Sequence, residues 1–191
     1  RSARNMTLAH WANEAIAEYR TIEAQSGIAF YHPCGTLTLS ASSEGFSYTQ
    51  QRHQLEHDLA FKYEELTPSK LAQRFLMLSN DLPYHGLYDG PPSGVINPRR
   101  YVAAQLACAA NHGATHINDV VTSLQPHHEY VALKTHSGHE YAAQQVIIAA
   151  GAYSGLYGLL PSPIDHTVKS EIVTLGEVSA KTAATLADMP S

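Results

Sequence analysis

Residues 94–153 read GVINPRRYVAAQLACAANHGATHINDVVTSLQPHHEYVALKTHSGHEYAAQQVIIAAGAY, and the order of elements in this stretch decides the fold. Asn97 and Pro98 predict the start of a helix, and Gly113 predicts its end. The apolar face of that helix holds Val102, Leu106, Ala109 and Ala110. Segments rich in strand-forming residues follow at 115–117, 120–124, 130–135 and 141–149, with turn residues between them. Residues 146–149 are apolar without alternation, which is typical of a strand covered on both faces.

The first forty residues predict a helix and a hairpin. Apolar side chains recur at helical spacing from Leu8 to Ile22, and Gly27 predicts the end of this helix. Residues 28–31 and 36–40 predict two strands around the turn His32-Pro33-Cys34-Gly35.

The remaining segments predict shorter elements. A polar surface helix is expected over residues 47–59, and Thr67 and Pro68 predict the start of a helix that buries Leu71 and Phe75. We expect strands at residues 84–88 and 167–175 and a short helix at 153–160, whereas the tail at 179–187 is ambiguous.

Composition limits the classes of protein to which the chain can belong. With 191 residues, 44% of them hydrophobic and 15% charged, the chain predicts a globular fold with a core. The net charge of -5 and the scattered Lys and Arg residues give no basic surface for a phosphate backbone, so we expect no nucleic-acid partner. The most apolar stretch, residues 146–160, is shorter than the roughly 20 residues that span a bilayer, so we expect no membrane span. Cys34 and Cys108 match no metal or redox spacing, which favours a reduced, cytoplasmic protein.

Histidines are frequent enough to raise the question of a metal site. His53 and His57 lie four residues apart on the expected polar helix but lack an evident third ligand, and His127-His128 falls in a turn. We therefore expect solvated histidines and no metal site. The chain also has no Gly-x-Ser-x-Gly elbow, P-loop or Cys-His pairing that would indicate hydrolysis or phosphoryl transfer.

The order and spacing of these segments resemble the centre of the FAD-dependent oxidoreductase family that includes D-amino-acid oxidase and sarcosine oxidase. Gly94 and Pro98 match the family's Gly-x-x-x-Pro phrase before the helix, and Gly113-Ala114 matches the Gly-Ala pair that closes it. The segment Ala150-Gly151-Ala152-Tyr153 is similar to the family's Ala-Gly-Ala-Trp. Further matches are Arg1-Ser2-Ala3-Arg4 with the family's Arg-x-x-Arg, residues 30–39 with its Gly-centred strand pair, and residues 66–78 with its Leu-Thr-led helix. The resemblance runs from Arg1 to about Glu177.

Three features depart from the family's pattern. Lys169 and Ser170 stand where the family usually has the Arg and Gly of Pro-Val-Arg-Gly. The chain also lacks the Gly-x-Gly-x-x-Gly loop with which the family holds the pyrophosphate of FAD, and the family's long C-terminal part. We therefore interpret the chain as a central fragment, and expect that the fragment alone neither holds FAD nor is active.

The resemblance implies roles for particular residues. Arg1 and Arg4 would lie at the flavin and substrate site, where the planar guanidinium of Arg4 suits the carboxylate of an amino-acid substrate. Val121 matches a position whose backbone faces the adenine. Ala150, Gly151, Ala152 and Tyr153 match the turn against the adenosine and pyrophosphate, where glycine allows close approach of the backbone. Taken without the family, these segments have plainer readings: a solvated arginine pair at a chain end, and a buried strand followed by a glycine turn.

The expected fold class is α/β to α+β, with parts of two domains. Residues 1–28 and 95–160 would belong to an FAD-binding, Rossmann-like domain built from βαβ units and a β-meander. Residues 29–94 and 161–191 would belong to a mixed-sheet substrate domain. Sheet edges exposed in such a fragment predict self-association, for example as a homodimer.

The function that the resemblance implies is oxidation of the C–N bond of a secondary amine or an amino acid, as in sarcosine oxidase. In the family a hydride equivalent passes to flavin N5, the imine hydrolyses, and the reduced flavin usually gives its electrons to oxygen, which forms H2O2. The partner would be a small amine or amino acid. The alternative from another class is a non-catalytic ligand-binding or protein-interaction module derived from the same fold.

Overall fold

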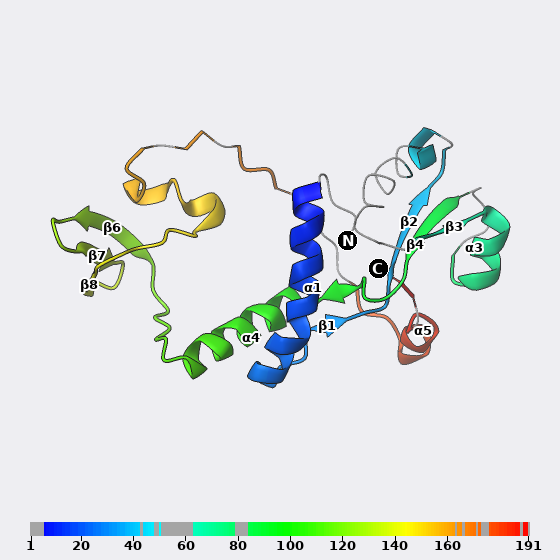
Figure 1. The fold of residues 1–191 in the computed structure, drawn as a ribbon, viewed down its shortest axis with the longest axis horizontal. Coiled ribbons are helices and arrows are strands. Elements are labelled where there is room, and N and C mark those ends of the chain that lie inside the picture. The colour runs from blue at the N-terminus through cyan, green and yellow to red at the C-terminus, as the bar shows by residue number, and fades with distance from the viewer. Residues whose placement is uncertain are drawn as a thin grey trace. The chain divides into compact units, whose positions relative to one another are not determined.

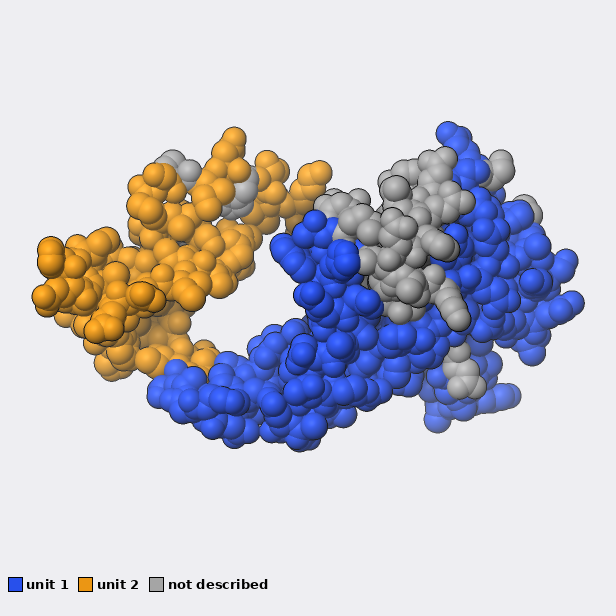
Figure 2. Space-filling model, viewed as in Figure 1, with its two compact units in different colours: residues 1–115, 177–191 blue, residues 116–176 orange. Residues whose placement is uncertain are grey.

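The computed structural model describes residues 6–42, 44–47, 50, 63–78, 84–162, 164–165, 167–170, 172, 176–187 and 189–190 (Figure 1). The chain divides into two compact units, which Figure 2 colours blue and orange. Unit 1 comprises residues 1–115 and 177–191, and unit 2 comprises residues 116–176. Each unit is a separate body with its own sheets.

Helix α1 (Met6–Ser26) opens unit 1 and ends where the sequence predicts. Gly27 has a φ of 70°, a left-handed conformation that glycine adopts without strain, and its N–H donates to Glu23 O at 2.9 Å. The inward face of α1 carries Ile16, Tyr19 and Ile22, which pack against the buried side chains Phe30, Tyr31 and Ala104. Burial of this apolar cluster is what stabilises α1 in place.

The predicted hairpin of residues 28–31 and 36–40 is wrong. Strand β1 (Tyr31–His32) pairs antiparallel with β5 (Val95–Ile96), whereas β2 (Thr36–Ser40) belongs to another sheet. The physical reason lies in the turn between them. The N–H of Gly35 donates to Ser93 O at 2.8 Å, so the turn is bonded to a distant segment rather than closed upon itself.

A second sheet in unit 1 is covered by a short helix. Its strand order is β2-β4-β3, with β4 (His85–Asp89) in the centre and β3 (Tyr63–Leu66) at one edge. Helix α3 (Pro68–Arg74) begins as predicted, because the Thr67 side chain accepts the N–H of Lys70. Its side chains pack with Leu66 in one buried cluster that also contains Leu71 and Phe75. The predicted helix over residues 47–59 lies largely outside the described residues.

Helix α4 (Pro98–Asn111) confirms the predicted start and end, but a different face is buried. Ala104 is fully buried, whereas Val102 is 57% and Leu106 40% exposed, so the predicted apolar face is not the one that packs. The reason is that α1 lies on the other side of α4, where Cys108 Sγ meets Ile22 O at 3.8 Å.

Unit 2 contains the predicted β-meander. Strands β6 (Val121–Pro126), β7 (Val131–Thr135) and β8 (Glu140–Ala143) form an antiparallel sheet in the order β6-β7-β8. The strand predicted at 115–117 is wrong, because these residues lie in no strand. The strand predicted at 141–149 is wrong in extent, because β8 ends at Ala143. Residues 145–150 lie in no strand, and the Ile147 side chain is 92% exposed. A strand needs a hydrogen-bonding neighbour, and no described strand lies beside this apolar segment.

The segments after the meander are shorter than predicted. Two 3-10 turns, η2 (Gly151–Tyr153) and η3 (Leu156–Gly158), replace the short helix expected at 153–160, because Tyr157 has a φ of 59° that interrupts a helix. Of the strand expected at 167–175, residues 167–170 and 172 lie in no strand, and the others lie outside the described residues. Helix α5 (Ala180–Thr185) forms in the ambiguous tail and belongs to unit 1.

The fold class is confirmed as a mixture of helices with antiparallel sheets. The assignment of segments to a flavin domain and a substrate domain stays a prediction, since the two compact units describe this chain alone. Within the described residues, no helix is both long enough and apolar enough to cross a bilayer.

Candidate functional site

A hollow of about 610 Å³ in unit 2 brings together residues that lie far apart in the sequence. Its wall consists of Asp119, Val120, Val121, Ala150, Tyr153, Tyr157 and Leu159. Val121, Ala150 and Tyr153 are among the cofactor residues predicted from the sequence. Gly151 and Ala152 connect Ala150 to Tyr153 within the turn η2. The two predicted catalytic residues, Arg1 and Arg4, lie outside the described residues.

The turn at Gly151 exposes backbone beside this hollow. Gly151 has a φ of 55°, and a Cβ built on it would meet nothing within 4 Å. Glycine is therefore required here by the backbone conformation rather than by crowding. The N–H of Tyr153 donates to Ala150 O at 3.0 Å, which closes the turn. The short closed turn places the Tyr153 side chain, 69% exposed, on the same wall as Ala150.

The other side of the hollow is the start of β6, which is held by Asp119. The N–H of Val120 donates to Asp119 Oδ1 at 2.7 Å, and the hydroxyl of Ser137 donates to Asp119 Oδ2. Hydrogen bonds from the side chains of Ser137 and Thr135, followed by the one from the Val120 N–H, lower the pKa of Asp119 from 3.8 to about 2. Asp119 is therefore ionised throughout the physiological range.

Sequence reasoning missed four of these wall residues, which are Asp119, Val120, Tyr157 and Leu159. Asp119 was visible only as part of an Asn-Asp turn, and its position directly before a strand was the available signal. No signal in the sequence marks Tyr157, because its place on the wall depends on its left-handed backbone after η2.

The wall suits the adenosine part of a dinucleotide. Most of its side chains are apolar or aromatic, as a flat base prefers, and none of the described wall residues is Lys or Arg. Cationic side chains or a helix N-terminus would be expected around a pyrophosphate, and the described wall has neither. The residues therefore fit the uncharged end of FAD better than its phosphates.

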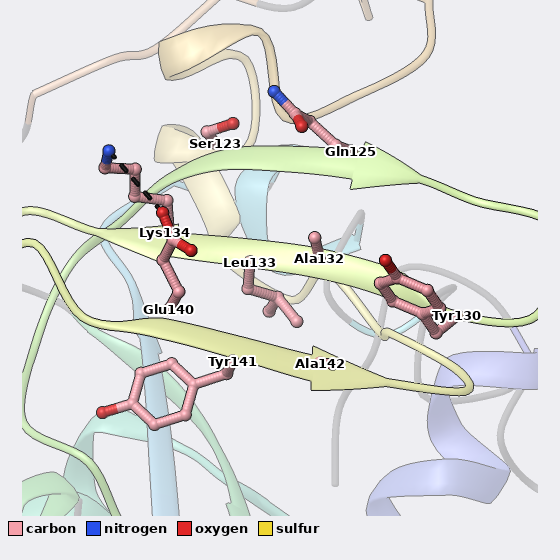
Figure 3. Close-up of a pocket in the computed structure, with 9 residues that line it drawn as sticks. All are labelled: Ser123, Gln125, Tyr130, Ala132, Leu133, Lys134, Glu140, Tyr141 and Ala142. Atoms are coloured by element: carbon pink, nitrogen blue, oxygen red, sulfur yellow. Dashed lines mark ion pairs between the residues drawn. The ribbon is translucent and has the colours of Figure 1, made fainter.

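A second hollow, of about 420 Å³, lies on the face of the meander sheet shown in Figure 3. Small side chains such as Ala132 and Ala142 line it, and Lys134 Nζ lies 3.8 Å from Glu140 Oε1. None of the predicted site residues lines this hollow. We therefore do not assign it a ligand.

A third hollow, in unit 1, is lined by the cationic side chain of Arg20, which is paired with Glu23. It is lined by Asn13, Ile16, Ala17, Arg20, Tyr31, Pro33, Pro91 and Pro92. The Arg20 guanidinium lies 2.9 Å from Glu23 Oε2 and 5.1 Å from the centre of the Tyr31 ring. Its charge is thus compensated within unit 1. Among the described residues, no group of three His, Cys, Asp or Glu side chains is arranged to hold a metal ion.

The chain is similar to a family of known proteins. A family model described as "FAD dependent oxidoreductase" (DAO) matches residues 1–190. No curated protein sequence gives a significant match to the chain.

Solved structures with similar folds include amino acid oxidases. NikD, an unusual amino acid oxidase essential for nikkomycin biosynthesis, in its open form, is 26% identical with a TM-score of 0.64, over 82% of this chain and 40% of NikD. Glycine oxidase from Geobacillus kaustophilus is 20% identical with a TM-score of 0.68, over 83% of this chain and 43% of that one. Iminodiacetate oxidase (IdaA) from Chelativorans sp. BNC1 is 23% identical with a TM-score of 0.62, over 80% of this chain and 41% of that one. This chain thus spans less than half the length of these solved structures.

Proposed function

This chain belongs to the DAO family of FAD-dependent oxidoreductases, and from that premise we propose that the complete protein oxidises the C–N bond of an amino acid or a secondary amine. The hollow of about 610 Å³ in unit 2, lined by Val121 and Tyr153 among others, would receive the adenosine part of FAD. We call its lining the adenosine wall. Val121, Ala150 and Tyr153 carry this assignment, because Val121 lies about 30 residues before the other two and yet shares one wall with them.

Several residues at this hollow have a definite part in the proposed site. The backbone of Val121 lies at the edge of a sheet, where peptide groups are open to a base. Gly151 leaves its backbone uncovered, so a ribose can approach closely. The rings of Tyr153 and Tyr157 offer flat apolar surface to adenine. When bound, FAD supplies the redox chemistry by accepting the hydride equivalent from the carbon next to nitrogen.

The proposed substrate is small and carries a carboxylate. Glycine oxidase and iminodiacetate oxidase are named for such compounds, and both share this fold. Arg1 and Arg4 are our candidates for the substrate end, where Arg4 would pair both carboxylate oxygens with its guanidinium. Substitution Arg4→Lys keeps the charge but removes the planar fork, so it tests this role directly.

The experiment uses the complete protein that contains this segment. We expect it to be purified yellow, and its flavin absorbance to bleach when glycine, sarcosine, iminodiacetate or another amino acid is added without oxygen. Readmission of air then separates an oxidase, which regains its colour and forms H2O2, from a dehydrogenase, which stays reduced until another acceptor is added.

Two results would count against the proposal. A complete protein that neither contains nor takes up FAD would remove its basis. A flavoprotein that stays oxidised with every amine and amino acid would keep the cofactor assignment and overturn the substrate class.

A further inference from the structure

Hydrogen bonds join the adenosine wall to the turn between β7 and β8, although this turn does not line the hollow. Ser137 and His139 lie in the turn between β7 and β8, and neither contacts the hollow. The Ser137 hydroxyl donates to Asp119 Oδ2 and lies 2.8 Å from His139 Nδ1. Thr135, which is 5% exposed, places its Oγ1 3.2 Å from the Ser137 hydroxyl. One hydrogen-bond network thus runs from the turn to the start of β6.

We propose that Asp119 and Ser137 are positioning residues for nucleotide binding, because they hold the backbone of Val120 and Val121 in the shape of the adenosine wall. The inference rests on the proposed function, since it concerns the same hollow. The two residues act through the backbone of β6, to which the Asp119 carboxylate is bonded at the Val120 N–H.

The bonding of the carboxylate supports a positioning role. Asp119 Oδ1 is taken up by the N–H of Val120 and Oδ2 by the Ser137 hydroxyl. Each oxygen of the Asp119 carboxylate thus already accepts a hydrogen bond from within the chain, which fixes the orientation of the side chain. Its two bonds join a turn residue to the residue that precedes Val121.

The irregular pairing of β6 explains why these hydrogen bonds are needed. The register of β6 against β7 shifts between Val121 and Ser123, so an irregularity of the ladder lies directly beside the adenosine wall. Residues at a bulge are held less firmly by ladder hydrogen bonds than residues in a regular pair. The His136 N–H also donates to Val120 O at 2.8 Å, which brings the same turn against the same peptide. The network therefore replaces the constraint that the ladder lacks at this point.

The proposal separates the two halves of FAD. A change in the network should weaken binding of the adenosine half and leave the flavin half unaffected. ADP contains the first half without the second, so it is the probe of choice. A purely structural role would instead lower the stability of the apoprotein without a specific effect on ADP.

The test compares variants of the complete protein after removal of its flavin. We expect Ser137→Ala and Asp119→Ala to weaken both ADP and FAD about tenfold or more, and by the same factor, as befits the loss of a hydrogen bond to a charged group. Ser137→Thr keeps the hydroxyl and should restore binding. Ser123→Ala removes a hydroxyl from the same strand, outside the network and the hollow, and should change neither affinity. Calorimetry gives the two affinities, thermal unfolding of each apoprotein gives its stability, and the absorption spectrum of bound flavin should be unchanged.

The outcomes are distinct. If Ser137→Ala binds ADP and FAD as the unaltered protein does, the inference is overturned while the proposed function stands. If the unaltered protein binds neither ADP nor FAD, the proposed function fails and the inference with it. If Ser137→Ala does not fold, the test uses Asp119→Asn, which keeps the size of the side chain. Weaker ADP binding by Asp119→Asn supports the inference, and unchanged ADP binding overturns it.

Discussion

Glu23 and Tyr31 join the end of helix α1 to strand β1, because Glu23 Oε1 accepts the backbone N–H of Tyr31 at 2.9 Å. The same oxygen accepts the N–H of Phe30 at 2.8 Å, and Oε2 pairs with Arg20. The Glu23 side chain is only 12% exposed. One carboxylate therefore satisfies two backbone donors at the point where the chain leaves the helix.

Replacing Glu23 should destabilise unit 1. Glu23→Ala leaves the N–H groups of Phe30 and Tyr31 without this acceptor, and we expect a loss of about 2 kcal/mol in the free energy of unfolding. Glu18→Ala, at an exposed position of the same helix, is the matched control and should change stability by less than about 0.5 kcal/mol. Urea unfolding of this chain measures both. Equal midpoints for the two variants would contradict the role of Glu23.

The same carboxylate predicts how stability depends on pH. The N–H groups of Tyr31 and Phe30 hold the pKa of Glu23 below its ordinary value of 4.5. The folded chain therefore stays ionised at Glu23 at a pH where the unfolded chain takes up a proton. The stabilisation is complete above the ordinary pKa and is lost as the pH falls below it. In Glu23→Gln this part of the acid-induced loss should disappear, as unfolding curves between neutral pH and about pH 3 would show.

Asp119 offers a titration that needs no cofactor. Its pKa of about 2 depends first on the Ser137 hydroxyl, so Ser137→Ala should raise that pKa toward the ordinary 3.8. The stability that Asp119 contributes is present above its ordinary pKa and is lost as the pH falls toward 2. NMR titration of the Asp119 carboxyl carbon measures the shift, and an unchanged pKa in Ser137→Ala would show that the network is not formed in solution.

Gly94 should tolerate no side chain. A Cβ at this position would lie 2.7 Å from Pro33 Cα and 2.9 Å from Cys34 N, which are backbone atoms that cannot swing away. We expect Gly94→Ala to cost roughly 3 kcal/mol or more, because β5 must move away from the turn that follows β1. Gly113→Ala is the control: a Cβ there meets nothing within 4 Å, so only its φ of 85° adds strain, about 1 kcal/mol. In thermal unfolding, the melting temperature of Gly94→Ala should therefore be well below that of Gly113→Ala.

Tyr153 should contribute to nucleotide affinity through its ring. In the complete protein, Tyr153→Ala is expected to weaken ADP binding about tenfold, the magnitude of one lost base–aromatic contact, while Tyr153→Phe binds normally. Tyr130→Ala, on the meander face and outside the adenosine wall, removes an exposed tyrosine of similar kind and should bind ADP as before. Equal losses for Tyr153→Ala and Tyr130→Ala would argue against this wall as the site.

The 191-residue chain by itself should associate. Among the described strands, β6 and β8 are the two edges of the meander and pair with no further strand, and unpaired strand edges bind one another. Ile147 and Val102 add exposed apolar surface. Light scattering coupled to size-exclusion chromatography should give a mass above that of a monomer, rising with concentration. A monomer at every concentration would contradict this expectation.

Local patterns predicted the elements that depend on their own residues. The caps Thr67 and Asn97 bond to the backbone a turn ahead, and Gly27 and Gly113 end their helices in left-handed conformations, as the sequence indicates. The meander could also be predicted from the sequence, because its strands are adjacent and its turns are short. In these places the energy that selects the structure comes from atoms only a few residues apart.

Elements that depend on a partner were predicted less well. Residues 146–149 have the composition of a buried strand, but they pair with nothing among the described residues. Residues 28–31 and 36–40 have the pattern of a hairpin, yet each bonds to a segment about fifty residues or more away. The buried face of α4 also depends on the position of α1, which no pattern in α4 encodes.

By itself, the sequence determined the helix ends, the meander and the family resemblance, because these follow from short-range hydrogen bonding, backbone conformation and the spacing of motifs. Only the tertiary structure decided that Val121, Ala150 and Tyr153 share a wall, that Tyr157 and Asp119 belong to it, and that β1 and β2 lie in different sheets. The physical reason is that a pocket wall and a sheet register are relations between residues distant along the chain, and those relations are chosen by packing and pairing energies that appear only once the chain has folded.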